Sequence, residues 1–143
     1  MGRILAIDYG TARVGMALSD PLKITAQPMD TLNISGNNEL LYSKLTEIFT
    51  KSDIEKIVIG YPRHLNGDAS DTTKIVDDVI NNIEDIIRSL GKDIAILKWD
   101  ERLTTVMAHN TMKELGIKQK DKKVHADRLA AMYILEDYLR YIS

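Results

Sequence analysis

An aspartate follows directly after the first apolar run of the chain, in the stretch ILAIDYG. Residues 4–7 are all apolar, Asp8 ends the run, and Gly10 follows two residues later. An aspartate in this position can open a turn, because its short side chain hydrogen-bonds the backbone just ahead. It can also present a carboxylate at the tip of a core strand, where a cation could bind. The stretch by itself leaves both interpretations open.

A second aspartate lies on a helix face that is otherwise apolar. In HADRLAAMYILEDYLRY the positions that share a helical face with Asp127 are Ala130, Ala131, Ile134 and Tyr138. A buried, unpaired charge costs roughly several kcal/mol, so Asp127 calls for a cation or a metal beside it. The alternative is an acid one turn inside a helix start, which the helix dipole stabilises by about 0.3–1 kcal/mol.

A third acid, Glu101, follows an extended stretch at residues 93–99 in the segment WDERLTT. The carboxyl ends of parallel strands meet at one edge of a sheet, so Asp8, Glu101 and Asp127 are predicted to converge there. Such oxygen ligands suit Mg²⁺ or Mn²⁺. Two such ions, about 3.5–4 Å apart, can activate a water and stabilise the leaving oxygen in phosphodiester hydrolysis. The scattered histidines, His64, His109 and His125, form no zinc pattern.

The first half of the chain is predicted to be mainly extended. Residues 3–9 predict a buried strand and residues 13–19 an antiparallel partner. A third extended stretch covers residues 24–33, with Pro28 favouring an edge position. A helix from Asn37 or Asn38 to about residue 50 follows, and then an apolar core strand at 56–60, parallel to the first.

The second half alternates helices with one further strand. A helix capped by Ser70 and closed by Gly91 carries a continuous apolar stripe, and a strand at 93–99 follows. A helix beginning between 100 and 105 and ending at Gly116, a lysine-rich loop, and a last helix at about 126–141 complete the chain. This order predicts an α/β fold with a mixed five-stranded sheet and helices on both faces.

Composition and charge narrow the class of protein. The 143 residues suit a single domain, 1–143, and the absence of cysteine favours a reducing cytoplasm. A formal net charge of -2 argues against a surface coated in positive charge, but not against a local basic patch. No apolar stretch approaches the length of a membrane span, so no membrane partner is expected.

Four motifs, in order, resemble those of a known family over essentially the whole chain: GRILAIDYGTARVGMALSDP, IVIGYPRHLNG, WDERLTT and DRLAAMYILEDYL. They resemble the YqgF-type family of pre-16S rRNA nucleases, also described as Holliday-junction-resolvase-like. The resemblance implies a ribonuclease-H-like fold, a bacterial cytoplasmic location, and metal-dependent hydrolysis of nucleic acid in 5′-end maturation of pre-16S rRNA. By position, Asp8, Glu101 and Asp127 would be the catalytic, metal-binding acids. The candidates for a fourth acid are Asp20, Asp68 and Asp100.

Contacts to the substrate are predicted near the same strand ends. Gly10 lets the backbone approach a phosphate or a metal, although a hairpin turn explains it equally. Guanidinium groups suit phosphate contacts, and lysines before the last helix could form a clamp; these candidates are Arg13, Arg63, Arg102, Lys122 and Lys123. Arg102 could instead hold Glu101 in place. Trp99 is predicted to lie in the core, and base stacking is not predicted.

Several functional alternatives stay open at this stage. The expected partners are precursor rRNA or branched DNA, with ribosomal assembly particles as further candidates, and the chain is expected to be a monomer or weak homodimer. A Holliday-junction-resolvase-like DNA nuclease would need a two-fold dimer. A non-catalytic ribosome-assembly module would bind RNA without needing three acids. The segment DYGT also resembles a phosphate loop of actin-like ATPases, but a second phosphate loop is not found.

Overall fold

The computed structural model describes residues 2–61, 71–100 and 119–143, with residues 71–72 and 119–128 as backbone only. Its strands are β1 (Arg3–Tyr9), β2 (Arg13–Ser19), β3 (Ala26–Pro28), β4 (Leu32–Asn33), β5 (Ile54–Tyr61) and β6 (Ala95–Asp100). Its helices are α1 (Asn38–Lys51), α2 (Asp71–Ser89) and α4 (Gln119–Ile142). Within the described residues, no helix has the length and apolar character needed to cross a membrane.

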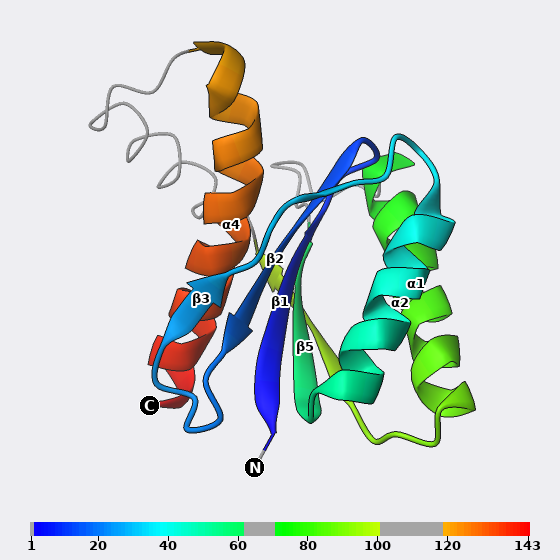
Figure 1. Ribbon diagram of the computed structural model, residues 1–143, viewed down its shortest axis with the longest axis vertical. Helices are drawn as coiled ribbons and strands as arrows, with labels where there is room; N and C mark the ends of the chain where they lie inside the picture. Colours follow the sequence, from blue (N-terminus) through cyan, green and yellow to red (C-terminus); the bar gives the residue numbers. More distant parts are fainter. Residues whose placement is uncertain (1, 62–70, 101–118) are drawn as a thin grey trace.

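The strands form one mixed sheet in the order β3-β2-β1-β5-β6, with β4 paired to β2. β1 and β2 are antiparallel, whereas β1, β5 and β6 are parallel. Helices α1 and α2 lie on one face of this sheet and α4 lies on the other (Figure 1). The predicted mixed sheet with helices on both faces is therefore confirmed, and its three parallel strands end at the same edge.

Each face of the sheet has its own hydrophobic core, because successive residues of a strand point to opposite faces. In β1, Leu5 and Ile7 belong to the core shared with α1 and α2. Ile4 and Ala6 belong to the core shared with α4. β1 is central and buried on both faces, so its sequence is continuously apolar rather than alternating.

The predicted third strand is divided into two short ones. β3 pairs with Ala17–Ser19 and β4 with Arg13–Val14, both on the outer side of β2. The register shifts by one residue between the two pairings, as in a β-bulge. Pro28 lies in the outermost strand of the described sheet, as predicted, where its missing N–H does not interrupt a ladder.

The helices α1 and α2 follow the predicted periodicity. In α1 the buried residues are Leu41, Leu45, Ile48 and Phe49, and the Asn37 side chain accepts a hydrogen bond from the Glu39 backbone at 3.2 Å. The apolar stripe of α2 fills the same core. Gly91, at φ +65°, follows the helix end in a conformation that favours glycine. Ser70 and the helix predicted to end at Gly116 lie outside the described residues.

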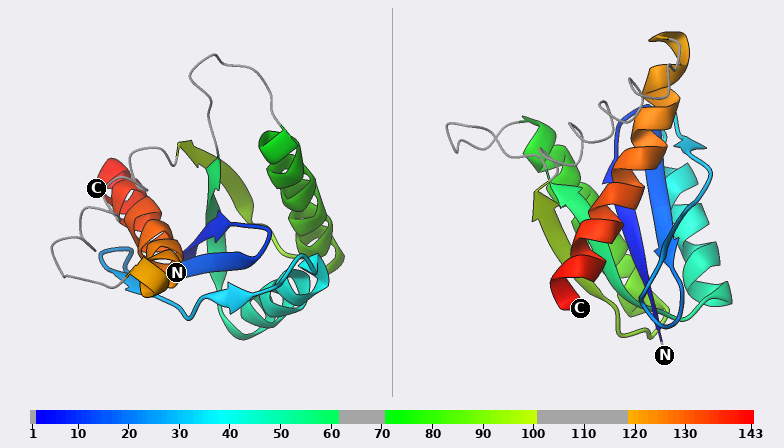
Figure 2. Two further views of the ribbon diagram at one scale, coloured as in Figure 1. Left: turned by 90° about the horizontal axis from the view of Figure 1, so that it is seen from above. Right: turned by 90° about the vertical axis from the view of Figure 1, so that its left-hand side faces the viewer.

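The last helix is longer than the sequence predicts. α4 begins at Gln119 rather than near residue 126, so Lys120, Lys122 and Lys123 are helical and the predicted lysine-rich loop is wrong over these positions. The first turns of α4 project beyond the edge of the sheet at which β1 ends (Figure 1; Figure 2, right). Their polar sequence, QKDKK, lacks an apolar stripe because this part of the helix rises past the sheet.

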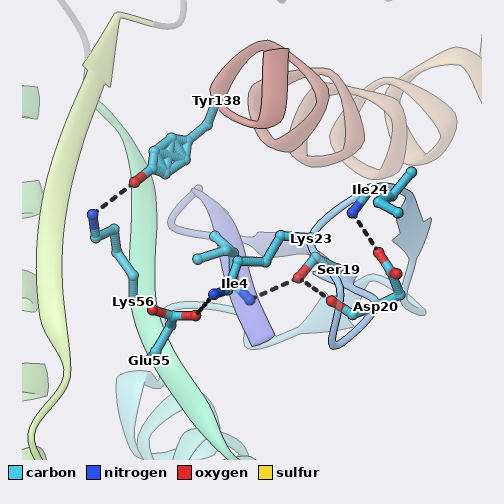
Figure 3. Close-up of polar contacts among 8 residues, drawn as sticks. All are labelled: Ile4, Ser19, Asp20, Lys23, Ile24, Glu55, Lys56 and Tyr138. Atoms are coloured by element: carbon cyan, nitrogen blue, oxygen red, sulfur yellow. Dashed lines mark hydrogen bonds and ion pairs between the residues drawn. The ribbon is translucent and has the colours of Figure 1, made fainter. Parts of the chain in front are cut away.

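The opposite end of the sheet is fixed by side-chain hydrogen bonds (Figure 3). The buried Ser19 hydroxyl accepts the Ile4 N–H at 2.8 Å and donates to the Asp20 carbonyl at 3.0 Å. Lys23 and Glu55 form an ion pair nearby. The Lys56 ammonium donates to the Tyr138 hydroxyl at 2.7 Å, which ties α4 to β5. Of these contacts, the one between Lys56 and Tyr138 positions α4 on the sheet.

Candidate active site

Asp8 lies near the end of β1 on the face of the sheet that α4 covers. Ile4 and Ala6 precede it at alternate positions and pack against α4, so strand alternation directs Asp8 to the same face. Asp8 is half-buried, whereas Ala6 is fully buried. The Asp8 carboxylate thus lies at the border of the core that α4 covers, next to the edge of the sheet where β1 ends.

The strand neighbours of Asp8 on both sides are glycines. Asp8 pairs with Gly15 of β2. On the other side Ile7 pairs with Ile59, so Gly60 of β5 is one residue further along, level with Asp8. Cross-strand neighbours on one face have Cβ atoms about 4.5–5.5 Å apart, and here both are missing. The two positions directly beside Asp8 therefore carry no side chain, which leaves room for a ligand there.

Gly15 is a candidate site residue that reasoning from the sequence missed. It stands inside the predicted strand RVGMALS, where a glycine often marks a close approach by a ligand or another backbone. That signal was available in the sequence. Its meaning depends on the register, however, because only the pairing of β1 with β2 brings Gly15 beside Asp8.

The turn between β1 and β2 requires Gly10 for steric reasons. A Cβ atom at Gly10 would lie 2.7 Å from the Arg13 carbonyl oxygen, closer than such contacts allow. Arg13, a half-buried residue, begins β2 directly after this turn. The hairpin explanation of Gly10 therefore holds, whether or not its backbone also contacts substrate.

The loop at residues 34–36 is hydrogen-bonded to this turn. The Ile34 and Gly36 N–H groups donate to the Ala12 and Thr11 carbonyls at 2.9 and 2.7 Å. The Tyr9 hydroxyl donates to the Asn38 side chain at 2.7 Å. Partial burial raises the pKa of this tyrosine, and the hydrogen bond to Asn38 opposes the rise. The backbone that follows Asp8 is thus held in one conformation.

The other predicted acids are placed only in part. Glu101 lies outside the described residues, directly after Asp100, the last residue of β6. Asp127 is in α4, described as backbone only, one turn before Ala131. Ala131 and Ala6 belong to the same buried cluster, so that turn of α4 is directed toward the end of β1 where Asp8 stands. Because α4 begins at Gln119, Asp127 is about two turns inside the helix, and the helix-dipole explanation is wrong.

The predicted substrate contacts are also placed in part. Lys122 and Lys123 are on the first turns of α4, described as backbone only. Arg63 and Arg102 lie outside the described residues, as does Asp68, one candidate for the fourth acid. Asp20, another candidate, is wrong, because it follows the far end of β2, five residues beyond Gly15 and about 16 Å away at ~3.3 Å per residue. Asp100 ends β6 at the same edge as Asp8.

A polar contact network ties α2 to the ends of β5 and β6. The Tyr61 hydroxyl donates to Asp77 at 3.1 Å, and Lys98 pairs with the same carboxylate at 3.1 Å. The Lys98 ammonium also lies 4.6 Å from the centroid of the Tyr61 ring. The three residues fix the last residues of the two strands relative to each other, and Glu101 follows one of those strands in the sequence.

Among the predicted metal ligands, Asp8 is the one whose side chain the structure describes. Within them, no group of three or more acidic, histidine or cysteine side chains could hold a metal ion. Asp8 offers hard oxygen donors beside two glycines, which fits a hydrated Mg²⁺ or Mn²⁺. The residues that would complete the ligand set are those whose side chains are not described.

The fold defines the class of protein. The chain superposes on the RuvC protein of Thermus thermophilus in complex with a Holliday junction substrate, with a TM-score of 0.57, 12% identity and coverage of 100% of this chain and 97% of that one. A second Thermus thermophilus RuvC structure gives a TM-score of 0.55, with 13% identity and coverage of 97% and 96%. This likeness confirms the ribonuclease-H-like fold.

The chain belongs to the RuvX family, described as Holliday junction resolvase, whose model matches residues 2–141. A relative from Ruminiclostridium cellulolyticum, named "Putative pre-16S rRNA nuclease", is 43% identical over 141 residues, which cover 99% of this chain and 96% of the relative. One of the same name from Acetivibrio thermocellus is 39% identical over 137 residues, covering 96% and 94%. The resemblance to the YqgF-type family is thereby confirmed.

Proposed function

We propose that this protein is a metal-dependent endonuclease that hydrolyses phosphodiester bonds in the 5′-end maturation of pre-16S rRNA. Membership of the RuvX family and the names of its relatives support this proposal. The structural observation that carries it is the position of Asp8, a half-buried carboxylate between two glycines at the edge where the parallel strands end. A fold that only bound RNA would have no need of an acid in this position.

Asp8, Glu101 and Asp127 are the proposed catalytic and metal-binding residues. Asp8 is the central ligand, since β1 lies in the middle of the sheet. Glu101 follows β6 and Asp127 comes from α4, so the three acids belong to three separate elements. Bound Mg²⁺ or Mn²⁺ supplies Lewis-acid stabilisation and an activated water. The three carboxylates would hold the ions and balance their positive charge.

The backbone near Gly10 and five cations form the proposed contacts to the substrate strand: Arg13, Arg63, Arg102, Lys122 and Lys123. Arg13 begins β2 next to the supported turn, and the two lysines are on the part of α4 that projects beyond the sheet. Guanidinium groups bind phosphate oxygens in pairs, whereas lysines contribute as point charges. The modest acidity elsewhere directs the polyanion to this edge.

Cleavage of defined substrates tests the proposal. The wild type and Asp8→Asn are incubated with a pre-16S 5′ leader RNA and a four-way DNA junction, in Mg²⁺, Mn²⁺ or EDTA. We expect metal-dependent cutting of the leader that falls at least about 100-fold in Asp8→Asn, because even a residue that only supports a metal ligand changes activity 10–100-fold when lost. Asp53→Asn, an exposed aspartate just before β5, is the matched control and should cut normally.

The junction is the second candidate substrate, because the family description is Holliday junction resolvase. Preferential cutting of the junction would replace rRNA maturation with resolution, and a two-fold dimer in sedimentation would then be expected. As a maturation nuclease, the protein is proposed to act as a monomer or weak homodimer, with ribosomal assembly particles as partners. Tight RNA binding with no cutting, unaffected by Asp8→Asn, would contradict both and favour a non-catalytic assembly module.

A further inference from the structure

A cavity of about 550 Å³ opens between β6 and the C-terminal end of α4. It is lined by Lys98, Trp99, Asp100, Asp137, Arg140 and Tyr141. Both views in Figure 2 show this end of α4 beside β6. We call this cavity the aromatic pocket, because its apolar wall is formed by aromatic rings.

The rings of the aromatic pocket differ in burial: one is anchored to the sheet and another is exposed to solvent. Trp99 contacts Tyr138 and Tyr141 edge to face, with centroids 5.7 and 5.9 Å apart. Tyr138 is 3% exposed and anchored by Lys56, so it packs α4 onto the sheet. Tyr141 is 75% exposed and adds little to that packing. Contrary to the sequence prediction, Trp99 is only half-buried.

Trp99 of the aromatic pocket is level with Asp8 across the sheet, so that the two residues belong to one row of laterally paired positions. Trp99 pairs with Gly60, and Gly60 is level with Asp8. Trp99 packs against the α4 core, which is also the face toward which Asp8 points. Two strand spacings, about 10 Å, separate β1 from β6, and the residue between them in this row has no side chain.

The polar groups of the aromatic pocket suit a nucleotide. Arg140, whose side chain is 73% exposed, can meet a phosphate at the rim. Asp137 lies 3.7 Å from Arg140 and offers carboxylate oxygens to the amino groups of a base. Exposed aromatic rings beside cations form the stacking platforms of proteins that bind single strands.

We propose that the aromatic pocket binds an unpaired nucleobase of the substrate strand, close to the phosphodiester that is cut. The inference rests on the proposed nuclease function and deepens it, because it selects single-stranded segments over continuous duplex. The base stacks against Tyr141 and the exposed side of Trp99, while its phosphate passes along the row toward Asp8.

Trp99 is the single tryptophan of the chain, so intrinsic fluorescence reports on the aromatic pocket directly. The full chain in EDTA is titrated with a single-stranded RNA on the order of ten nucleotides long, and with an abasic strand of equal length. We expect quenching by the base-bearing strand alone. Tyr141→Ala should weaken its binding about tenfold, and Tyr141→Phe should retain it.

Ile142→Ala is the matched control, since it removes a partly exposed side chain from the next position of the same helix and should bind as the wild type does. Equal quenching by the abasic strand, or normal binding by Tyr141→Ala, would overturn the inference even if the wild type cuts RNA. Base-dependent quenching that Tyr141→Ala weakens, in a protein that cuts nothing, would support the pocket and contradict the nuclease proposal.

Discussion

Asp8 and Asp20 are both aspartates beside strand ends, but their surroundings differ. Asp8 stands between two glycines on the face covered by α4. Asp20 follows β2 and its Oδ1 accepts hydrogen bonds from the Ile24 and Thr25 backbones, each at 2.8 Å. The Asp20 carboxylate thus stabilises a turn. This is the role that the sequence also allowed for Asp8.

The Asp20 turn is expected to loosen in acid. The backbone hydrogen bond from Thr25, and then that from Ile24, lower the pKa of Asp20. A lowered pKa in the folded state means that the ionised carboxylate stabilises the turn above the ordinary value of 3.8, and that this stabilisation is lost as the pH falls through the lowered pKa. Amide exchange at Ile24 and Thr25, followed by NMR, should therefore become less protected below about pH 4.

Asp20→Asn is the matched variant for this prediction. An amide does not titrate in this range, so the pH dependence of protection at Ile24 and Thr25 should disappear. If the wild type and Asp20→Asn lose protection at the same pH, a group other than Asp20 controls the turn.

Single residues were predictable where local sequence decides their environment. The apolar run before Asp8 indicates a buried strand with a carboxylate near its tip, and the structure has that strand. Gly15 and Trp99 depend on which strands are neighbours, which no local pattern contains. Trp99 was assigned to the core by its type, but β6 is the outermost strand of the described sheet and leaves one side of the ring open.

At the scale of elements, α4 connects the sheet to the proposed catalytic edge. It contacts β1, β2, β3 and β5 through one buried face. Small residues, Ala131 on α4 against Ala6 and Ala17 on the strands, set how closely the helix approaches. Asp127 is one turn beyond this contact, so the helix position determines where that acid lies.

Ala131→Leu is expected to displace α4 from the sheet. Ala131 is 0% exposed, and extra methylene groups in a packed core cost about 1–3 kcal/mol. We expect that loss in urea unfolding, together with a fall in metal-dependent cutting under conditions where the variant is folded. Ser43→Leu, on an exposed position of α1, is the control and should change neither. Unchanged stability in Ala131→Leu would show that α4 is not closely packed there.

The sequence predicted most of the described elements, but it missed the start of α4 and the division of β3 from β4. Apolar periodicity identified α1, α2 and the parallel core strands, because each must bury a continuous face. The start of α4 was missed because the sequence QKDKK has no apolar periodicity that would indicate a helix. The division of β3 from β4 arises from pairing with β2, which is a long-range property.

At the scale of the whole molecule, binding is expected to depend on a few local cations, since the formal net charge is only -2. The five cations proposed at the catalytic edge contribute about −3.5 to the slope of log K against log salt with single-stranded RNA. Changing Lys122 and Lys123 to Gln should reduce that slope by about 1.4. Fluorescence titrations at several salt concentrations measure it.

The matched control changes Lys44 and Lys51 to Gln, on α1 at the opposite face of the sheet, where both lysines pair with Glu47. The slope should then stay at the wild-type value. An unchanged slope in the Lys122 and Lys123 variant would mean that the projecting turns of α4 do not contact the strand.

The order of α4 after all the described strands also has a consequence for synthesis. Chains are made from the N-terminus, so the sheet is complete in sequence before residues 119–142 have been translated. The turn that carries Asp127 can settle onto β1 only once the remainder of α4 has left the ribosome. A nascent chain whose last described helix is still inside the ribosome would therefore have an incomplete proposed centre, and the centre would form only after α4 has emerged.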